Sequence, residues 1–185
     1  MLRESKFKVQ SLAVFLAALS LFGFRPQKIS PQLQEKIDNA VETTFEVEEF
    51  TLERLALDVT LNEKTQVELG GENLFNIVKE GKSLGYLYLG EAPSMKKVFD
   101  YVVLFNPDMS IKKSKILIYR EDYGRQVGSQ RWLKQFIGKK SGESLAYGED
   151  IDAISGATIS AKSMTLAVSN VLLSMKVLQE HNFFE

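Results

Sequence analysis

The sequence lacks cysteine altogether and contains a single histidine among its 185 residues. Without cysteine the chain can form no disulfide, Fe–S cluster, thiolate zinc site or thioester intermediate, and it can attach neither a c-type haem nor a lipid at an N-terminal cysteine. The one histidine, His181, lies near the C-terminus, which leaves little for a catalytic triad or a histidine metal site. We therefore expect no metal site, assign no catalytic residue, and find no support for a hydrolase.

The sequence also has no large excess of positive or negative charge. Lys and Arg together number 23, and Asp and Glu number 24. Residues 1–25 hold four of the basic residues and one acidic residue, so the remainder carries 19 positive and 23 negative charges. This mildly acidic body has no basic stripe, so nucleic acid is not an expected partner. Hydrophobic residues at 44% and charged residues at 25% are typical of a globular protein rather than a disordered or polytopic one.

One long uncharged run occurs, over residues 9–24, and it follows the basic residues Arg3, Lys6 and Lys8. A basic flank before an apolar run is the layout of a secretory signal. As a helix the run would span about 24 Å, less than the hydrocarbon core of about 30 Å, which suits a signal segment or a short anchor. Residues 1–25 are therefore predicted to be a signal peptide or a membrane anchor, and the sequence leaves its cleavage open.

Hydrophobic periodicity predicts a helix over residues 31–45, because apolar side chains recur every four positions from Leu33 to Phe45. Ser30 is suited to cap this helix, and the proline after it is suited to its first position. Residues 46–69 are compatible with either helix or strand. We therefore divide the chain after the signal into an N-terminal helical or mixed segment, residues 26–69, and a main domain, residues 70–185.

The main domain is predicted to contain several strands joined by short links. The predicted strands are residues 73–78, 84–89, 98–105 and 111–119. Links this short cannot make parallel crossovers, so the strands should form an antiparallel meander. Helices are predicted over residues 131–137, with Trp132 and Phe136 on one packed face, and over residues 160–179. The expected fold class is α+β, an antiparallel meander packed with helices and preceded by the N-terminal signal or anchor helix.

One motif stands out, Asp-Ala-Ile-Ser-Gly-Ala-Thr-Ile-Ser over residues 152–160, directly before the last predicted helix. Small residues let backbone amides approach a ligand, and the N–H groups at a helix N-terminus favour a phosphate. The hydroxyls of Ser155, Thr158 and Ser160 could also carry a phosphate covalently. From the residues alone, an ordinary helix start in a Ser/Thr-rich turn is the favoured interpretation.

This motif resembles the flavinylation motif of the FMN-binding domain family. That family includes flavin-carrying subunits of Na⁺-translocating NADH:quinone reductase and of Rnf-type complexes, and many small exported proteins. In the family, a dedicated flavin transferase uses FAD to attach FMN through a phosphoester bond to the last threonine of the motif. The resemblance implies that Thr158 bears FMN, with Asp152, Ser155, Gly156 and Ala157 as the recognition context.

The resemblance extends loosely over residues 70–178. It includes Gly81-Lys82 before a strand that contains Gly85, the turn at residues 106–108, and a glycine-punctuated loop at residues 121–128 before a helix with Trp and Phe. By this resemblance four further residues are expected near the flavin: Glu121, Gly124, Gly128 and Ser129. It also implies an extracytoplasmic location, since the family's modification occurs outside the cytoplasm in bacteria.

Taken together, the sequence predicts an exported, FMN-carrying flavoprotein for electron transport, anchored to the inner membrane on its periplasmic or cell-surface side. Its expected partners are a flavin transferase for maturation and redox proteins in or outside the membrane. It is more readily interpreted as an electron carrier than as a stand-alone enzyme, although a flavin-dependent reductase component stays open. The alternative is a non-redox exported ligand-binding or sensory module in which Thr158 only begins a helix.

Overall fold

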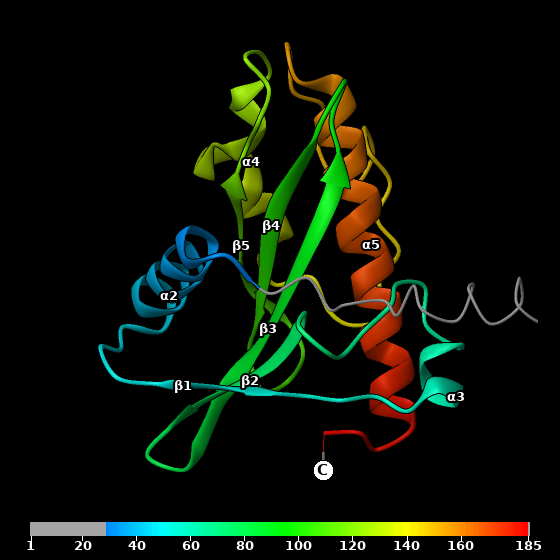
Figure 1. The fold of residues 1–185 in the computed structure, drawn as a ribbon. Helices are drawn as coiled ribbons and strands as arrows, with labels where there is room; N and C mark the ends of the chain where they lie inside the picture. The colour runs from blue at the N-terminus through cyan, green and yellow to red at the C-terminus, as the bar shows by residue number, and fades with distance from the viewer. Residues whose placement is uncertain (1–28, 185) are drawn as a thin grey trace, which may run out of the picture.

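A five-stranded antiparallel sheet in the order β1-β2-β3-β4-β5 forms the centre of the protein. The computed structural model describes residues 29–184, and the predicted signal or anchor helix lies outside these residues. The strands are β1 (Thr51–Arg54), β2 (Leu74–Lys79), β3 (Lys82–Pro93), β4 (Val98–Phe105) and β5 (Ile111–Ile118). Each strand pairs with the next along the chain, so the predicted α+β meander is confirmed (Figure 1).

Short turns make this order possible. At the β2–β3 turn, Glu80 and Gly81 both have positive φ angles, of 51° and 75°, which is the backbone twist that a two-residue hairpin requires. In β4, alternate side chains point to opposite faces, and both faces are buried. Phe99, Tyr101, Val103 and Phe105 belong to one apolar core, and Val102 and Leu104 belong to the other.

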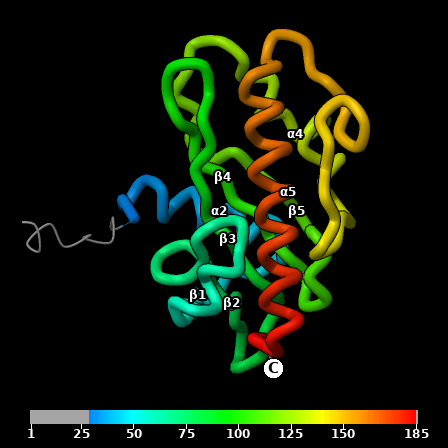
Figure 2. The backbone as a smooth tube through the Cα atoms, turned by 90° about the vertical axis from the view of Figure 1, so that its right-hand side faces the viewer, coloured from blue at the N-terminus to red at the C-terminus, as the bar shows by residue number. Residues whose placement is uncertain are grey.

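Each face of the sheet is covered by a helix. Helix α2 (Pro31–Phe45) begins as predicted, since the Ser30 hydroxyl accepts a hydrogen bond of 3.2 Å from the Leu33 N–H. Its buried residues Ile37 and Val41 pack in the smaller core. Helix α5 (Thr158–Glu180) covers the other face and lies in front of the sheet in Figure 2. Fully burying each large aliphatic side chain at these interfaces contributes about 1.5–3 kcal/mol.

The structure also assigns the segments for which the sequence pattern gave no single or no complete assignment. Residues 46–69 form the short strand β1 and a single turn of helix, α3 (Val59–Asn62), rather than one long element. Because β1 pairs with β2, residues on both sides of the predicted boundary at residue 70 share one sheet, and the division itself stays a prediction. The predicted helix at residues 131–137 is α4 (Gln130–Leu133) continued by the 3₁₀ turn Lys134–Phe136.

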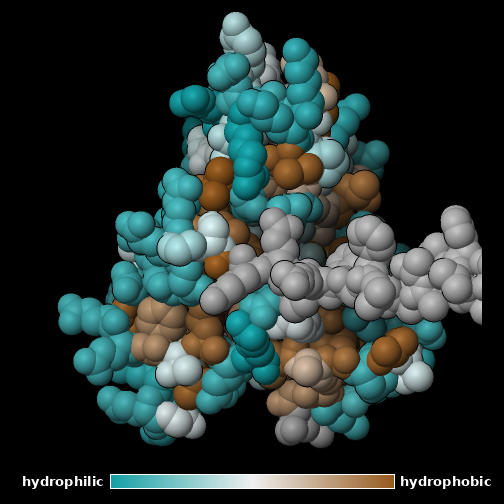
Figure 3. All heavy atoms as spheres, in the orientation of Figure 1, coloured by the Kyte–Doolittle hydropathy of each residue, from teal (hydrophilic) through white to brown (hydrophobic). Residues whose placement is uncertain are grey.

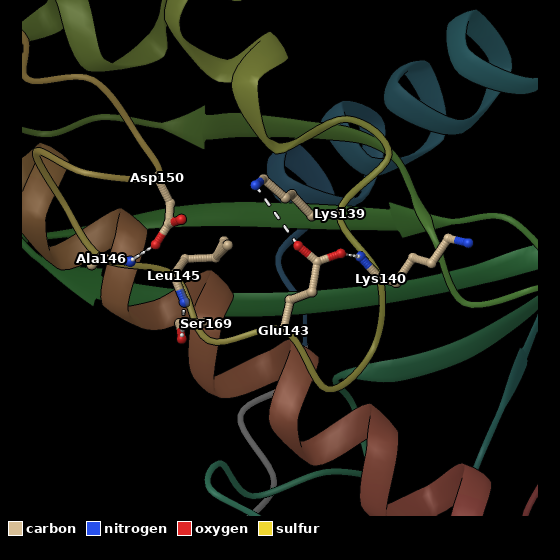
Figure 4. A network of polar contacts seen from close by, with 7 residues as sticks. All are labelled: Lys139, Lys140, Glu143, Leu145, Ala146, Asp150 and Ser169. Atoms are coloured by element: carbon tan, nitrogen blue, oxygen red, sulfur yellow. Dashed lines mark hydrogen bonds and ion pairs between the residues drawn. The ribbon is translucent and has the colours of Figure 1, made fainter.

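A long polar loop, residues 138–151, runs beside α5 and is held by local hydrogen bonds (Figure 4). The Leu145 N–H donates to the Ser169 hydroxyl of α5 at 2.9 Å, and the Ala146 N–H donates to the Asp150 carboxylate at 2.8 Å. Glu143 accepts from the Lys140 N–H at 2.6 Å. The first of these contacts satisfies a buried backbone N–H, and the other two hold exposed parts of the loop.

The membrane prediction rests on the N-terminal segment. Across residues 29–184, the structure shows no helix with the length and apolar character needed to cross a membrane.

Replacing Ser169 with alanine should lower the free energy of unfolding by about 1–3 kcal/mol, because the buried Leu145 N–H then loses its acceptor. Chemical denaturation of the purified protein measures this change. Ser163→Ala is the matched control on the same helix, where we expect a change within about 0.5 kcal/mol. Equal stability of both variants would show that the loop does not depend on this bond.

Candidate functional site

A cavity of about 230 Å³ opens where α5 begins, at one end of the sheet. It is formed by the β3–β4 turn, the end of β5, the loop after it and the motif. The lining residues are Met95, Tyr119, Glu121, Tyr123, Gly124, Gly156, Ala157, Thr158, Ile159 and Ser160. Ligand pockets are typically about 300–1,000 Å³, so a ligand of nucleotide size would sit here only in part and stay partly exposed.

The motif delivers its backbone directly into the first turn of α5. Gly156 has a φ of +78°, a left-handed conformation that favours glycine, and Ala157 precedes the helix. Within residues 29–184 no side chain caps this helix, so its first N–H groups are left without a side-chain acceptor. Thr158 is exposed at the first helical position and lines the cavity. This end of the helix is therefore suited to a phosphate beside the Thr158 hydroxyl.

Gly124 brings the loop after β5 against the motif. Its φ is +79°, and a Cβ there would lie 2.7 Å from the Tyr119 hydroxyl and 3.4 Å from the Gly156 carbonyl oxygen. The Tyr119 hydroxyl in turn lies 2.9 Å from the hydroxyl of Ser160, which is buried. The two loops can approach this closely only if this position is a glycine. The Tyr119 hydroxyl engages Ser160, whereas Thr158 stays accessible.

Glu121 holds the β3–β4 turn at the rim of the cavity. One oxygen of its buried carboxylate accepts from the Lys96 N–H at 2.6 Å, the Ser94 hydroxyl at 2.8 Å and the Lys97 N–H at 2.9 Å. The backbone hydrogen bond from Lys96, followed by the Ser94 hydroxyl, lowers the pKa of Glu121 below its ordinary value. The carboxylate therefore positions the turn that carries Met95.

The other predicted residues lie behind the cavity or beside it. Asp152 is held through its backbone, since its N–H donates to Gln135 at 2.8 Å and its carbonyl accepts from the Trp132 indole N–H at 2.8 Å. Ser155 is exposed in the same loop but does not line the cavity. Gly128 ends the 3₁₀ turn Arg125–Gly128, and Ser129 precedes α4.

The predicted packing of Trp132 against Phe136 is confirmed. Both side chains are buried, and their ring centroids lie 5.4 Å apart at an interplanar angle of 83°. Four cavity residues were not among the site residues predicted from the sequence: Met95, Tyr119, Tyr123 and Ile159. Met95 lies in a turn between strands and Tyr119 at a strand end, so nothing local to either residue marks it as part of a site.

A second hollow, of about 440 Å³, lies on the α2 side of the sheet. Its buried carboxylate, Asp100, forms an ion pair of 2.6 Å with Arg120. Burial raises the pKa of the neighbouring Glu91, and the charge of Asp100 raises it further. The buried charge is therefore compensated, whereas the buried Oδ1 of Asn73, which also lines the hollow, has no hydrogen-bond partner in residues 29–184.

Replacing Glu121 with alanine should destabilise the protein near neutral pH by an amount that shrinks in acid. The folded-state pKa is lowered from 4.5, so the stabilisation is fully present above about pH 4.5 and is lost as the pH falls through the folded value. Denaturant unfolding of both proteins between pH 3 and pH 7 measures this dependence. Glu149→Ala, at an exposed site, should show no such trend, and a gap for Glu121→Ala that is independent of pH would contradict this role.

Comparison with known proteins shows what the part of the chain around the site is similar to. The family model described as FMN-binding domain matches residues 96–173. No curated protein matches the chain. Among solved structures, the chain is similar to NqrC from Shewanella oneidensis, with a TM-score of 0.54 and 15% sequence identity, covering 82% of this chain and 95% of that one. At this identity the similarity shows a shared fold.

The matched range contains every lining residue of the cavity except Met95. Its uncapped helix start, its glycine turn and its apolar and aromatic walls fit a group that combines a phosphate with a flat ring system. Residues 96–173 are thus similar to the FMN-binding domain, and the cavity at the N-terminus of α5 is built mainly from this part of the chain.

Proposed function

We propose that this protein is an exported electron carrier whose FMN is linked to the Thr158 hydroxyl by a phosphoester bond. The observation that carries the proposal is the position of Thr158. Its side chain is exposed at the first residue of α5, beside N–H groups that no side chain caps in residues 29–184. The motif around it resembles the flavinylation motif of the matched family.

Attachment needs a hydroxyl that a flavin transferase can reach. The Thr158 oxygen would attack the phosphorus on the FMN side of FAD, forming one P–O bond while the bond to AMP breaks. AMP leaves, and the hydroxyl proton passes to a base of the transferase or to water. Ser160 is less suited because it is buried beside the Tyr119 hydroxyl, and Ser155 does not line the cavity.

The cavity walls suit a flavin ring that remains in contact with solvent. Met95 and Ile159 are apolar, and Tyr119 and Tyr123 are aromatic, so they can cover a ring without supplying an acid–base pair. A bound flavin supplies the redox chemistry, and the protein supplies its position and its electrostatic surroundings. A cavity too small to enclose a whole nucleotide leaves part of the ring accessible to a redox partner.

Location and partners follow from the N-terminal segment and from the family. Residues 1–25 combine a basic flank with an apolar run, which supports export and tethering at the membrane. The fold shared with NqrC supports a role beside membrane redox proteins. A covalent link would prevent loss of the cofactor by diffusion outside the cytoplasm.

Thr158→Val should abolish covalent flavin while leaving the fold intact, because valine has the shape of threonine without the hydroxyl. The full chain is co-expressed with a flavin transferase, and labelling is measured by in-gel fluorescence and by intact mass, which should rise by one FMN less water. Ser160→Ala is the matched control and should stay labelled. An unlabelled wild-type chain, with a transferase that labels a known acceptor, would favour the non-redox ligand-binding alternative.

Export can be tested separately. A chain that lacks residues 1–28, co-expressed with the same transferase, should remain in the cytoplasm and carry no flavin, whereas the full chain should be labelled in the membrane or extracytoplasmic fraction. Cell fractionation followed by in-gel fluorescence measures both. Equal labelling of the two chains would remove the argument for an extracytoplasmic modification.

A further inference from the structure

The cavity lies at the centre of an exposed apolar surface. Four large apolar side chains around it are strongly exposed: Met95 by 59%, Val98 by 41%, Tyr123 by 82% and Ile159 by 51%. They are four of the seven exposed large hydrophobic residues in the described part of the chain. The β3–β4 turn, the loop after β5 and the start of α5 lie at the same end of the sheet in both views of the backbone (Figures 1 and 2). We call this surface the flavin end.

Basic side chains surround the flavin end. Lys96 and Lys97 follow Met95 in the β3–β4 turn, and Arg125 follows the cavity residue Gly124; all three are exposed. Among residues 29–184, no carboxylate lies within ion-pair distance of these three cations. One exposed acid, Asp122, lies in the same loop, and the buried carboxylate of Glu121 is occupied by the turn.

The N-terminal part of the described chain carries the opposite charge. Residues 29–93 contain 13 acidic and five basic residues, and residues 132–184 contain five of each. Residues 94–131 contain eight basic and four acidic residues, but Lys112, Lys113 and Arg131 among them lie beside α2 and not at the flavin end. The acidic half includes α2, β1 and the β2–β3 turn, which lies at the other end of β3 from the flavin end (Figure 1). Electrostatic attraction would therefore orient an acidic partner towards the flavin end, and it would orient a basic partner towards the acidic N-terminal part.

We propose that the flavin end docks a redox protein that presents an acidic rim around its own cofactor. An apolar centre with a charged margin is the usual anatomy of a protein–protein interface. The proposal rests on the proposed function, since it assumes that FMN is attached at Thr158. In the exchange, one reduced flavin gives one electron to each of two acceptor molecules and releases two protons to water.

The test follows oxidation of the reduced, flavin-labelled full chain by stopped-flow absorbance. The acceptors are two one-electron proteins of opposite charge, acidic plastocyanin and basic cytochrome c. The double variant Lys96→Glu/Arg125→Glu reverses two charges at the flavin end, at side chains without hydrogen bonds or ion pairs in the described part of the chain. Lys79→Glu/Lys82→Glu makes the same charge change at the β2–β3 turn and serves as the matched control.

At low salt, Lys96→Glu/Arg125→Glu should slow oxidation by plastocyanin by about tenfold and accelerate oxidation by cytochrome c, and added salt should reduce both effects. The control should change either rate by less than about twofold. Equal effects of the two double variants, or a wild-type preference for the basic acceptor, would overturn the proposal. Unchanged acceptor rates together with loss of binding to anionic lipid vesicles would overturn it in favour of a membrane surface.

Failure of the proposed function gives a different result. A chain without covalent flavin shows no in-gel fluorescence before any acceptor is added, and it gives no flavin oxidation signal. A labelled chain whose oxidation rates do not depend on the flavin-end charges would leave the flavin assignment intact and contradict the docking surface alone.

Discussion

Burial of β4 between two helices is the constraint on which the rest of the structure depends. Its alternate side chains enter both apolar cores, and each large residue fully removed from water contributes about 1.5–3 kcal/mol. Helix α5 covers one face and α2 covers the other. The N-terminus of α5 lies where β5 ends, at the end of the sheet that holds the cavity.

The site is assembled by a few polar contacts on top of that packing. One carboxylate oxygen of Glu121 accepts hydrogen bonds from three donors of the β3–β4 turn. Gly124 allows the loop after β5 to pack closely against the motif. The Asp152 backbone is held by α4 and the turn after it, through Trp132 and Gln135. These contacts come from four separate segments, so the accessible Thr158 hydroxyl depends on the whole end of the fold.

Much of the architecture was predictable because it is encoded locally. The strand at residues 98–105 and the helix at residues 31–45 match the structure at both ends, since aromatic and β-branched runs, a serine cap and regular apolar spacing act within a few residues. Residues 46–69 could not be assigned, because β1 is defined by pairing with β2 rather than by its own pattern. In the site, Glu121, Gly124, Gly156, Ala157 and Thr158 were predicted and line the cavity, whereas Gly128 and Ser129 do not.

Local residue chemistry was sufficient to specify the antiparallel meander, the motif before the last helix and the absence of cysteine chemistry, since each is a property of neighbouring residues. Tertiary packing alone brought Met95 and Tyr119 to Thr158, and it gathered exposed apolar and basic side chains around the same cavity. Contacts between residues far apart in the chain depend on how the helices and the sheet bury their apolar faces. A local sequence pattern does not predict this packing.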